Sequence, residues 1–270
     1  MLGVLTGVDP ADSQTAPSAG RFLTDYTPSL DPAGLKGARI GVARGYSGFD
    51  DRVDKLFENA LEVMKRQGGV IVDPVELPHE LRFANEFEME VLYHEFKADL
   101  NGYLASLGPQ APIKSLAELI QYNEKHADLE LSLFGQELLT RSDERGDLTN
   151  PKYLEALRKS HQLSRDEGID KVMQAQRLDA IVAPTGGVPA MLDPVGGSRG
   201  GGGGCSTPAA MAGYPIVTVP MGFILGLPIG LAFFGRAWSE PTLVKLAFAF
   251  EQETKHRKTP KFLATAELRT

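Results

Sequence analysis

Short apolar runs flank an amphipathic stretch in the first eighty residues of the chain. Residues 38–44, ARIGVAR, are typical of a short strand, and Val70–Leu77 is a second such run. Between them, one helical stripe ends at Gly68, a usual stop for a helix. The stripe consists of Val53, Leu56, Phe57, Ala60, Leu61 and Met64. The pattern predicts a βαβ unit with parallel strands and a right-handed crossover.

Residues 83–176 are dominated by helical spacing and predict a helical insert. Helices are expected over 83–107, over 116–124 and around Leu138. A fourth is expected from Asn150 to about Gln176, because Asn150 is a good N-cap and Pro151 suits the first helical position.

The last third of the chain returns to strands. A strand is predicted at 178–185, a short helix at 207–212, strands at 216–224 and 228–235, and a closing helix over 240–255. Residues 10–37 have weak periodicity and many turn-forming residues, which indicates an irregular connection. The predicted class is α/β, with a mixed central sheet flanked by helices.

Residues 213–235 carry no charge and are long enough to cross a membrane. However, Pro215, Pro220 and Pro228 each lack the N–H that a helix needs, and three interspersed glycines weaken a helix further. The residues between them are β-branched or aromatic. Two buried strands are therefore expected here, and no membrane segment.

Composition narrows the functional classes. The chain has 270 residues, 42% hydrophobic and 23% charged, with a net charge of −7. This acidic balance argues against a nucleic-acid partner, which requires a basic surface. The N-terminus has no basic region before Asp9 and Pro10 and does not resemble a secretory signal. Cys205 has no second cysteine to pair with, so a reducing, cytoplasmic location is expected.

The glycine tract between Gly196 and Pro215 raises several functional interpretations. A phosphate loop would need a lysine directly after the glycines, and none follows Gly204. Ser198 lies between glycines as in a nucleophile elbow, yet none of the five histidines has a distinctive setting as its base. A pocket wall remains, since glycine allows close approach of another group. A flexible surface loop is the simpler alternative.

Two other positions could carry chemistry. Cys205 precedes a predicted helix, which could favour a thiolate, although a lone cysteine among small residues is more typical of packing. Glu90 and His94 share a helix face and could bind a metal. No second histidine completes such a pattern, so a solvated acidic face is expected and no metal is predicted.

Several segments resemble the amidase signature family of hydrolases. They are DAIVAPT (179–185), STPAAMAGYPIVTVPMGF (206–223) and PIGLAFFGRAWSEPTLVKLAFAFE (228–251), with the closing PKFL. The middle segments LYHEFKADLNGYL and SLAELIQYNEKH resemble the peptide-amidase-like and broad-range branch. The opening MLGVLTGVDPADSQTA and LKGARIGVARGY resemble the part that follows the family's catalytic signature. Residues 1–270 are therefore expected to form the C-terminal part of one amidase domain, with a partial amidase-signature fold.

The resemblance implies a mechanism that uses a nucleophilic serine, a bridging serine in a cis peptide and a neutral lysine. Such enzymes hydrolyse carboxylic amides, including C-terminal amides, without a metal or organic cofactor. The sequence has neither a GGSSGGS-type run nor a DTGGS block, so no catalytic residue is assigned and the chain alone is expected to be inactive.

The resemblance also implies which residues line the substrate pocket. These are Thr185, Gly186, Gly203, Gly204, Cys205, Ser206 and Thr207. Some related amidotransferase subunits have an acidic side chain near the position of Gly203, which argues against that duty here. Tyr93 and Glu95 could close the substrate entrance, with core packing and solvation as the simpler roles.

The leading hypothesis is a C-terminal portion of an amidase that acts on a small-molecule amide. Its partner would be a complementary N-terminal half that carries the catalytic residues. The alternatives are a non-catalytic binding or assembly subunit, or a truncated inactive remnant. Because a complete relative would share its sheet between both halves, the strands near Ile40, Ile181, Ile216 and Leu231 are expected to leave an edge or a face uncovered.

Overall fold

The computed structural model describes residues 1–82, 86–190, 197 and 202–262. The chain forms two compact units. The first combines residues 1–82 with 163–270, and the second comprises 83–162. Ser198 and most of the glycine tract before Gly202 lie outside the described residues.

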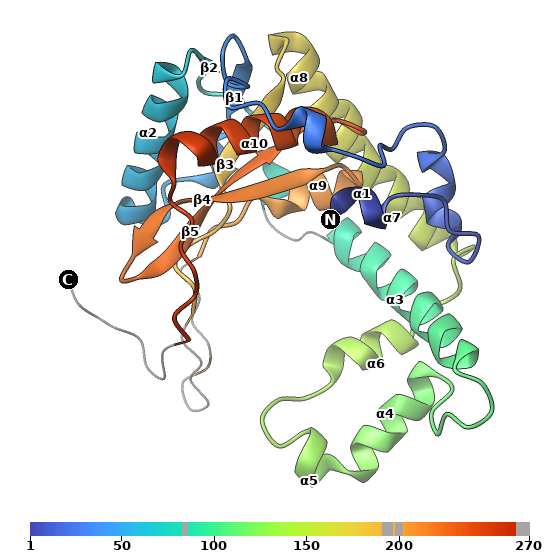
Figure 1. Ribbon diagram of the computed structural model, residues 1–270. Coiled ribbons are helices and arrows are strands. Elements are labelled where there is room, and N and C mark those ends of the chain that lie inside the picture. The colour runs from blue at the N-terminus through green and yellow to red at the C-terminus, as the bar shows by residue number, and fades with distance from the viewer. Residues whose placement is uncertain (83–85, 191–196, 198–201, 263–270) are drawn as a thin grey trace. The chain divides into compact units, whose positions relative to one another are not determined.

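The described part of the first unit contains a five-stranded sheet with the order β2-β1-β3-β5-β4 (Figure 1). β1 (Arg39–Val42) pairs in parallel with β2 (Val70–Val72) and with β3 (Ala180–Pro184). β5 (Leu227–Phe234) is antiparallel to both β3 and β4 (Ile216–Ile224). The predicted mixed sheet and the parallel βαβ pairing are confirmed.

One face of the sheet is covered by α2 (Asp51–Arg66) and α10 (Glu240–Thr254). The predicted stripe of α2 supplies five buried side chains, Val53, Phe57, Ala60, Leu61 and Met64. The carboxylate of Asp50 caps this helix by accepting from the Arg52 N–H at 2.9 Å. The rings of Phe233 and Phe250 pack edge to face at 6.3 Å.

The opposite face of the sheet packs against α8 (Asp170–Gln176) and α9 (Ser206–Ala212). Its core includes Met173, Ala209 and Phe234, all of them buried. The sheet is thus enclosed between two helical layers near β1 and β3, as expected for an α/β fold.

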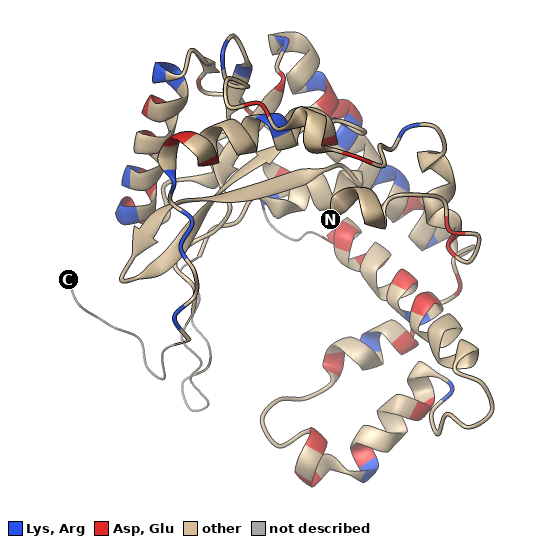
Figure 2. Cartoon of the chain, viewed as in Figure 1, with Lys and Arg blue, Asp and Glu red and all other residues tan. Residues whose placement is uncertain are grey.

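The uncharged stretch after α9 forms the β4–β5 hairpin, which confirms the prediction of two strands. Figure 2 shows β4 and β5 without charged residues, whereas acidic and basic residues alternate along α2. The turn consists of Leu225 and Gly226, with φ values of 51° and 78°. Two consecutive positive φ values give the turn type whose twist matches that of the strands. No described helix is long and apolar enough to cross a membrane.

The second unit is helical. It contains α3 (Glu86–Ser106), α4 (Leu116–Lys125), α5 (Ala127–Glu130), α6 (Glu137–Asp143) and α7 (Pro151–His161). The side chain of Asn150 accepts from the Lys152 N–H at 2.9 Å, which confirms the predicted cap of α7.

A single helix from Asn150 to Gln176 is not what the structure contains. After α7 the chain passes through a π-helical stretch, Gln162–Ile169, and α8 begins at Asp170. Gly168 has non-helical backbone angles, φ −98° and ψ −113°. A side chain on Gly168 would also lie 2.5 Å from the Leu163 carbonyl oxygen, so the break requires a glycine.

The predicted strand at 70–77 is also shorter than expected. β2 ends at Val72, just before Asp73 and Pro74, since proline cannot donate to the ladder. The remaining short elements are α1 (Leu2–Leu5) and 3₁₀ turns at Ser13–Ser18, Thr27–Ser29, Arg44–Tyr46 and His79–Arg82.

Candidate functional site

Thr185 directly follows the last residue of β3 and is fixed by both strands that continue the sheet. Its backbone N–H donates to the Gly230 carbonyl at 2.8 Å. Its Oγ1 lies 2.7 Å from the Oγ1 of Thr218 on β4. In a sheet with parallel strands, the carboxyl ends of those strands are the usual place for a ligand. Thr185 is half-buried there, which suits a group that contacts substrate.

The described end of the glycine tract lies beside this threonine. The Gly187 N–H donates to the Gly202 carbonyl at 2.9 Å, which joins the two loops. A side-chain carbon placed on Gly204 would lie 4.0 Å from the Thr185 carbonyl oxygen. The structure therefore brings together four of the predicted residues, namely Thr185, Gly186, Gly203 and Gly204.

Gly203 is a position where only glycine fits. Its φ is +70°, a region that side chains disfavour. A Cβ there would lie 2.2 Å from Cε1 of Phe49. Phe49 packs in turn against the core beneath α2 and α10, so the glycine loop is held by the body of the first unit.

Cys205 is a buried packing residue. Its side chain is 0% exposed and belongs to the core beside α8 and α9. Burial raises the pKa of the Cys205 thiol to about 12, because the thiolate would lose its hydration. The thiolate interpretation therefore fails at neutral pH. Ser206 begins α9 with an exposed side chain, and Thr207 is half-buried.

Glu90 and His94 are not the solvated acidic face that the sequence suggested. The His94 side chain is only 1% exposed, and its Nδ1 lies 2.9 Å from the Glu90 carbonyl oxygen. The Glu90 carboxylate lies 3.0 Å from the Arg145 guanidinium. The prediction failed because this face of α3 packs inside the second unit, where the His94 ring lies 5.5 Å from the ring of Tyr153 on α7. Among the described residues, no cluster of three or more possible ligands could hold a metal ion.

The two helical residues considered for a substrate entrance have local roles in the second unit. Tyr93 is buried, and the Arg145 guanidinium lies 5.0 Å from its ring centroid. Glu95 accepts from the Tyr153 hydroxyl at 2.9 Å. Burial, and after it this hydrogen bond, raises the pKa of Tyr153 to about 12.

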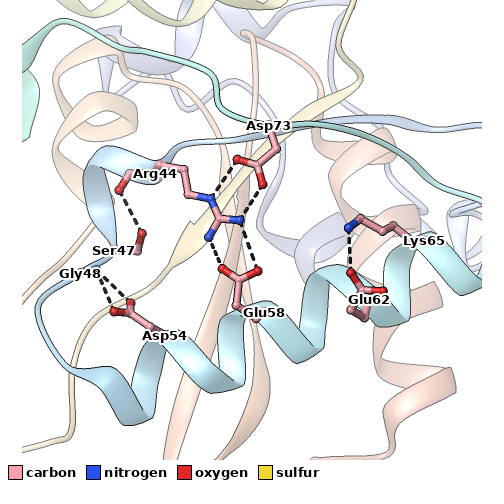
Figure 3. Close-up of polar contacts among 8 residues, drawn as sticks. All are labelled: Arg44, Ser47, Gly48, Asp54, Glu58, Glu62, Lys65 and Asp73. Atoms are coloured by element: carbon pink, nitrogen blue, oxygen red, sulfur yellow. Dashed lines mark hydrogen bonds and ion pairs between the residues drawn. The ribbon is translucent and has the colours of Figure 1, made fainter.

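An ionic cluster that sequence reasoning missed lies at the carboxyl ends of β1 and β2. Figure 3 shows the Arg44 guanidinium between the carboxylates of Asp73 and Glu58. Its Nε and Nη2 donate to Asp73 at 2.9 and 2.6 Å. Hydrogen bonds to both carboxylates raise the pKa of Arg44 above its usual range. The parallel pairing of β1 with β2 brings Arg44 and Asp73 together. The predicted parallel pairing was the sequence feature from which this cluster could have been found.

Thr218, Gly230 and Phe49 also escaped sequence reasoning, because they contact the site from other strands and loops. The only signal available was the resemblance of their surrounding segments to one family.

Comparison of the chain with known proteins establishes that family. The amidase family model matches residues 1–244. The chain belongs to the amidase family.

Several members of the family are closely similar to this chain. The peptide amidase of Stenotrophomonas maltophilia is 44% identical over 95% of the chain, with a TM-score of 0.83. A probable amidase of Arabidopsis thaliana is 33% identical over 98% of the chain. A glutamyl-tRNA(Gln) amidotransferase subunit of Moorella thermoacetica is 29% identical over 96%. These similarities confirm the α/β amidase fold.

The chain spans about half the length of these amidase relatives. The match covers 51% of the Stenotrophomonas protein, 48% of the Arabidopsis protein and 53% of the Moorella protein.

Proposed function

We propose that this amidase chain supplies the substrate-facing wall of an amide hydrolase, while a complementary segment supplies its nucleophile and base. The observation that carries this proposal is the 44% identity to a peptide amidase over almost all of this chain but only half of that enzyme. Similarity to glutamyl-tRNA(Gln) amidotransferase subunits supports a partner polypeptide as well.

The wall consists of Thr185 and Gly186 on one side and Gly203 and Gly204 on the other. The joined loops present backbone groups and a hydroxyl, which suit the polar but neutral atoms of a carboxamide. Cys205 supports the wall from the buried core, while Ser206 and Thr207 begin the adjacent helix.

We infer the substrate class from the two strands beside this wall. Residues 213–235, which supply β4 and β5, contain no charged side chain. A charged group would lose hydration against these strands, which offer it no counter-ion of their own. A neutral carboxylic amide, such as the C-terminal amide of a peptide, meets no such penalty.

The complementary segment would carry a Ser–cis-Ser–Lys group. A neutral lysine would accept a proton through the bridging serine while the other serine attacks the amide carbonyl. Ammonia or an amine would leave, and water would then hydrolyse the acyl-enzyme. The part of this chain would be to orient the amide, since correct placement lowers the entropic part of the barrier.

The single buried cysteine supports a reducing location such as the cytoplasm.

Complementation tests the proposal. The chain is mixed with the half of the Stenotrophomonas peptide amidase that it does not match, and ammonia release from N-acetyl-phenylalaninamide is measured. We expect turnover from the mixture and none from either part alone. Turnover by this chain alone at an ordinary enzyme rate would contradict the proposal that a complementary segment supplies the nucleophile and base.

Two further readouts separate the alternatives. A complex that forms and binds the amide without turnover would favour a non-catalytic binding or assembly subunit. Circular dichroism of the chain without a cooperative thermal transition would favour an inactive remnant.

A further inference from the structure

Thr185, Thr218 and Gly230 come from three adjacent strands or their ends and lie on the same side of the sheet. Leu231 and Phe233 of β5 are in the core beneath α2 and α10, so their neighbours Gly230 and Ala232 face the other side. Thr218 pairs directly with Ala232, and opposite residues in an antiparallel pair share a face. Thr218 is exposed on that face.

Gly230 creates the space in which the two hydroxyls meet. A Cβ on Gly230 would lie 2.6 Å from the Thr218 Oγ1 and 2.7 Å from the Thr185 Oγ1. Both distances are shorter than any ordinary contact with a carbon atom. Any side chain at this position would therefore push the hydroxyls apart, although they lie 2.7 Å from one another in the structure.

The pair of hydroxyls has a simple hydrogen-bond inventory. Each hydroxyl has one hydrogen to donate and two lone pairs to accept with. When Thr218 donates to Thr185, its own hydrogen is used, and the hydrogen of Thr185 is free to point away from the pair. Accepting one hydrogen bond also strengthens a hydroxyl as a donor.

We propose that Thr218 is a positioning residue that orients the Thr185 hydroxyl to donate to the carbonyl oxygen of the amide substrate. The inference rests on the proposed function, because it assigns a ligand group to the same wall. Thr185 is the residue that contacts the substrate, and Thr218 acts through it. Gly230 is the position that makes the arrangement possible.

Binding by the isolated chain provides the first test. Calorimetry measures the affinity for N-acetyl-phenylalaninamide of the wild type, Thr218→Val and Thr218→Ser. Valine keeps the shape of threonine without the hydroxyl, and we expect it to weaken binding roughly three- to tenfold, as for one lost hydrogen bond. Serine restores the hydroxyl and should restore the affinity. Chemical denaturation checks that valine leaves the stability unchanged.

Gly230→Ala is the second variant. The added methyl group should separate the hydroxyls and weaken binding to a similar extent without removing either of them. Gly102→Ala is its control, because nothing lies within 4 Å of a side-chain carbon there. We expect this control to bind as the wild type does. Wild-type affinity in Thr218→Val, equal loss in Thr218→Ser, or no binding by the wild type would each overturn the inference.

Kinetics in the complemented mixture separates this inference from the proposed function. Thr218→Val should lower kcat as well as raise KM, because the carbonyl oxygen gains negative charge in the transition state and its donor then matters most. A wild-type mixture that binds the amide but never turns it over would refute the proposed function while leaving the binding test of Thr218 decisive.

Discussion

The ring of Phe49 fills the space that a side chain on Gly203 would occupy. The two residues are 154 positions apart in sequence, yet a Cβ on Gly203 would lie 2.2 Å from the Phe49 Cε1. This contact ties the glycine loop to the core beneath α2 and α10. The contact thus helps to hold the candidate substrate wall, together with the backbone hydrogen bonds of Thr185 and Gly187.

Gly203→Ala should destabilise the chain by about 2 kcal/mol, because the methyl group must displace Phe49 or the loop. Part of any such effect comes from forcing a side chain into positive φ. Gly202→Ala is the matched control, since Gly202 has φ +72° and nothing within 4 Å of its Cβ position. Urea denaturation measures both variants. Equal losses of stability in the two variants would show that displacing Phe49 adds nothing to the cost of alanine at Gly203.

Cys205 should be unreactive in the folded chain at neutral pH. Its thiol is buried and its pKa is raised to about 12, so almost no thiolate is present. Iodoacetamide at pH 8 is expected to label the thiol only after the chain is unfolded in urea. Rapid labelling of the native chain would contradict the burial that places Cys205 behind the wall.

The same raised pKa predicts a loss of stability in alkaline solution. Unfolding returns the thiol to its ordinary pKa of 9.0, so the unfolded chain releases its proton before the folded chain does. The contribution of the neutral thiol is complete below pH 9 and is lost as the pH rises toward 12. Cys205→Ala should lose less stability than the wild type between pH 9 and 10.5, measured by urea denaturation. Parallel pH profiles would show that the thiol is already hydrated in the native state.

The sequence predicted the elements whose signals are local. The apolar stripe of α2 and the prolines and glycines of residues 213–235 each follow from spacing or from backbone chemistry within one segment. For the same reason the cap at Asn150 was predictable, since its side chain bonds the Lys152 N–H two residues away.

Other features depend on residues that are distant in sequence. The register that places Thr218 opposite Ala232, and so beside Thr185, cannot be obtained from the pattern of either strand alone. Gly168 also gave no clear signal, because a single glycine costs a helix only about 1 kcal/mol and is often tolerated. The need for glycine at the break arises only from the close approach of the Leu163 carbonyl, which the sequence does not show.

Arg44 should contribute more to stability than the exposed ion pairs of the same region. Its side chain is 32% exposed and binds two carboxylates, whereas the Lys65–Glu62 pair shown beside it in Figure 3 is more than half exposed on both sides. We expect Arg44→Ala to cost about 1 kcal/mol in low salt, and Lys65→Ala to have a much smaller effect. Urea denaturation at roughly 20 mM and roughly 1 M NaCl measures the screened part of each effect.

Arg44→Lys distinguishes charge from geometry in this cluster. A lysine keeps the positive charge but cannot donate in the forked arrangement that reaches Asp73 through both Nε and Nη2. It should therefore recover only part of the loss in Arg44→Ala, and that part should be the salt-sensitive one. Full recovery by lysine would mean that charge alone holds the carboxyl ends of β1 and β2 together, with no role for the fork.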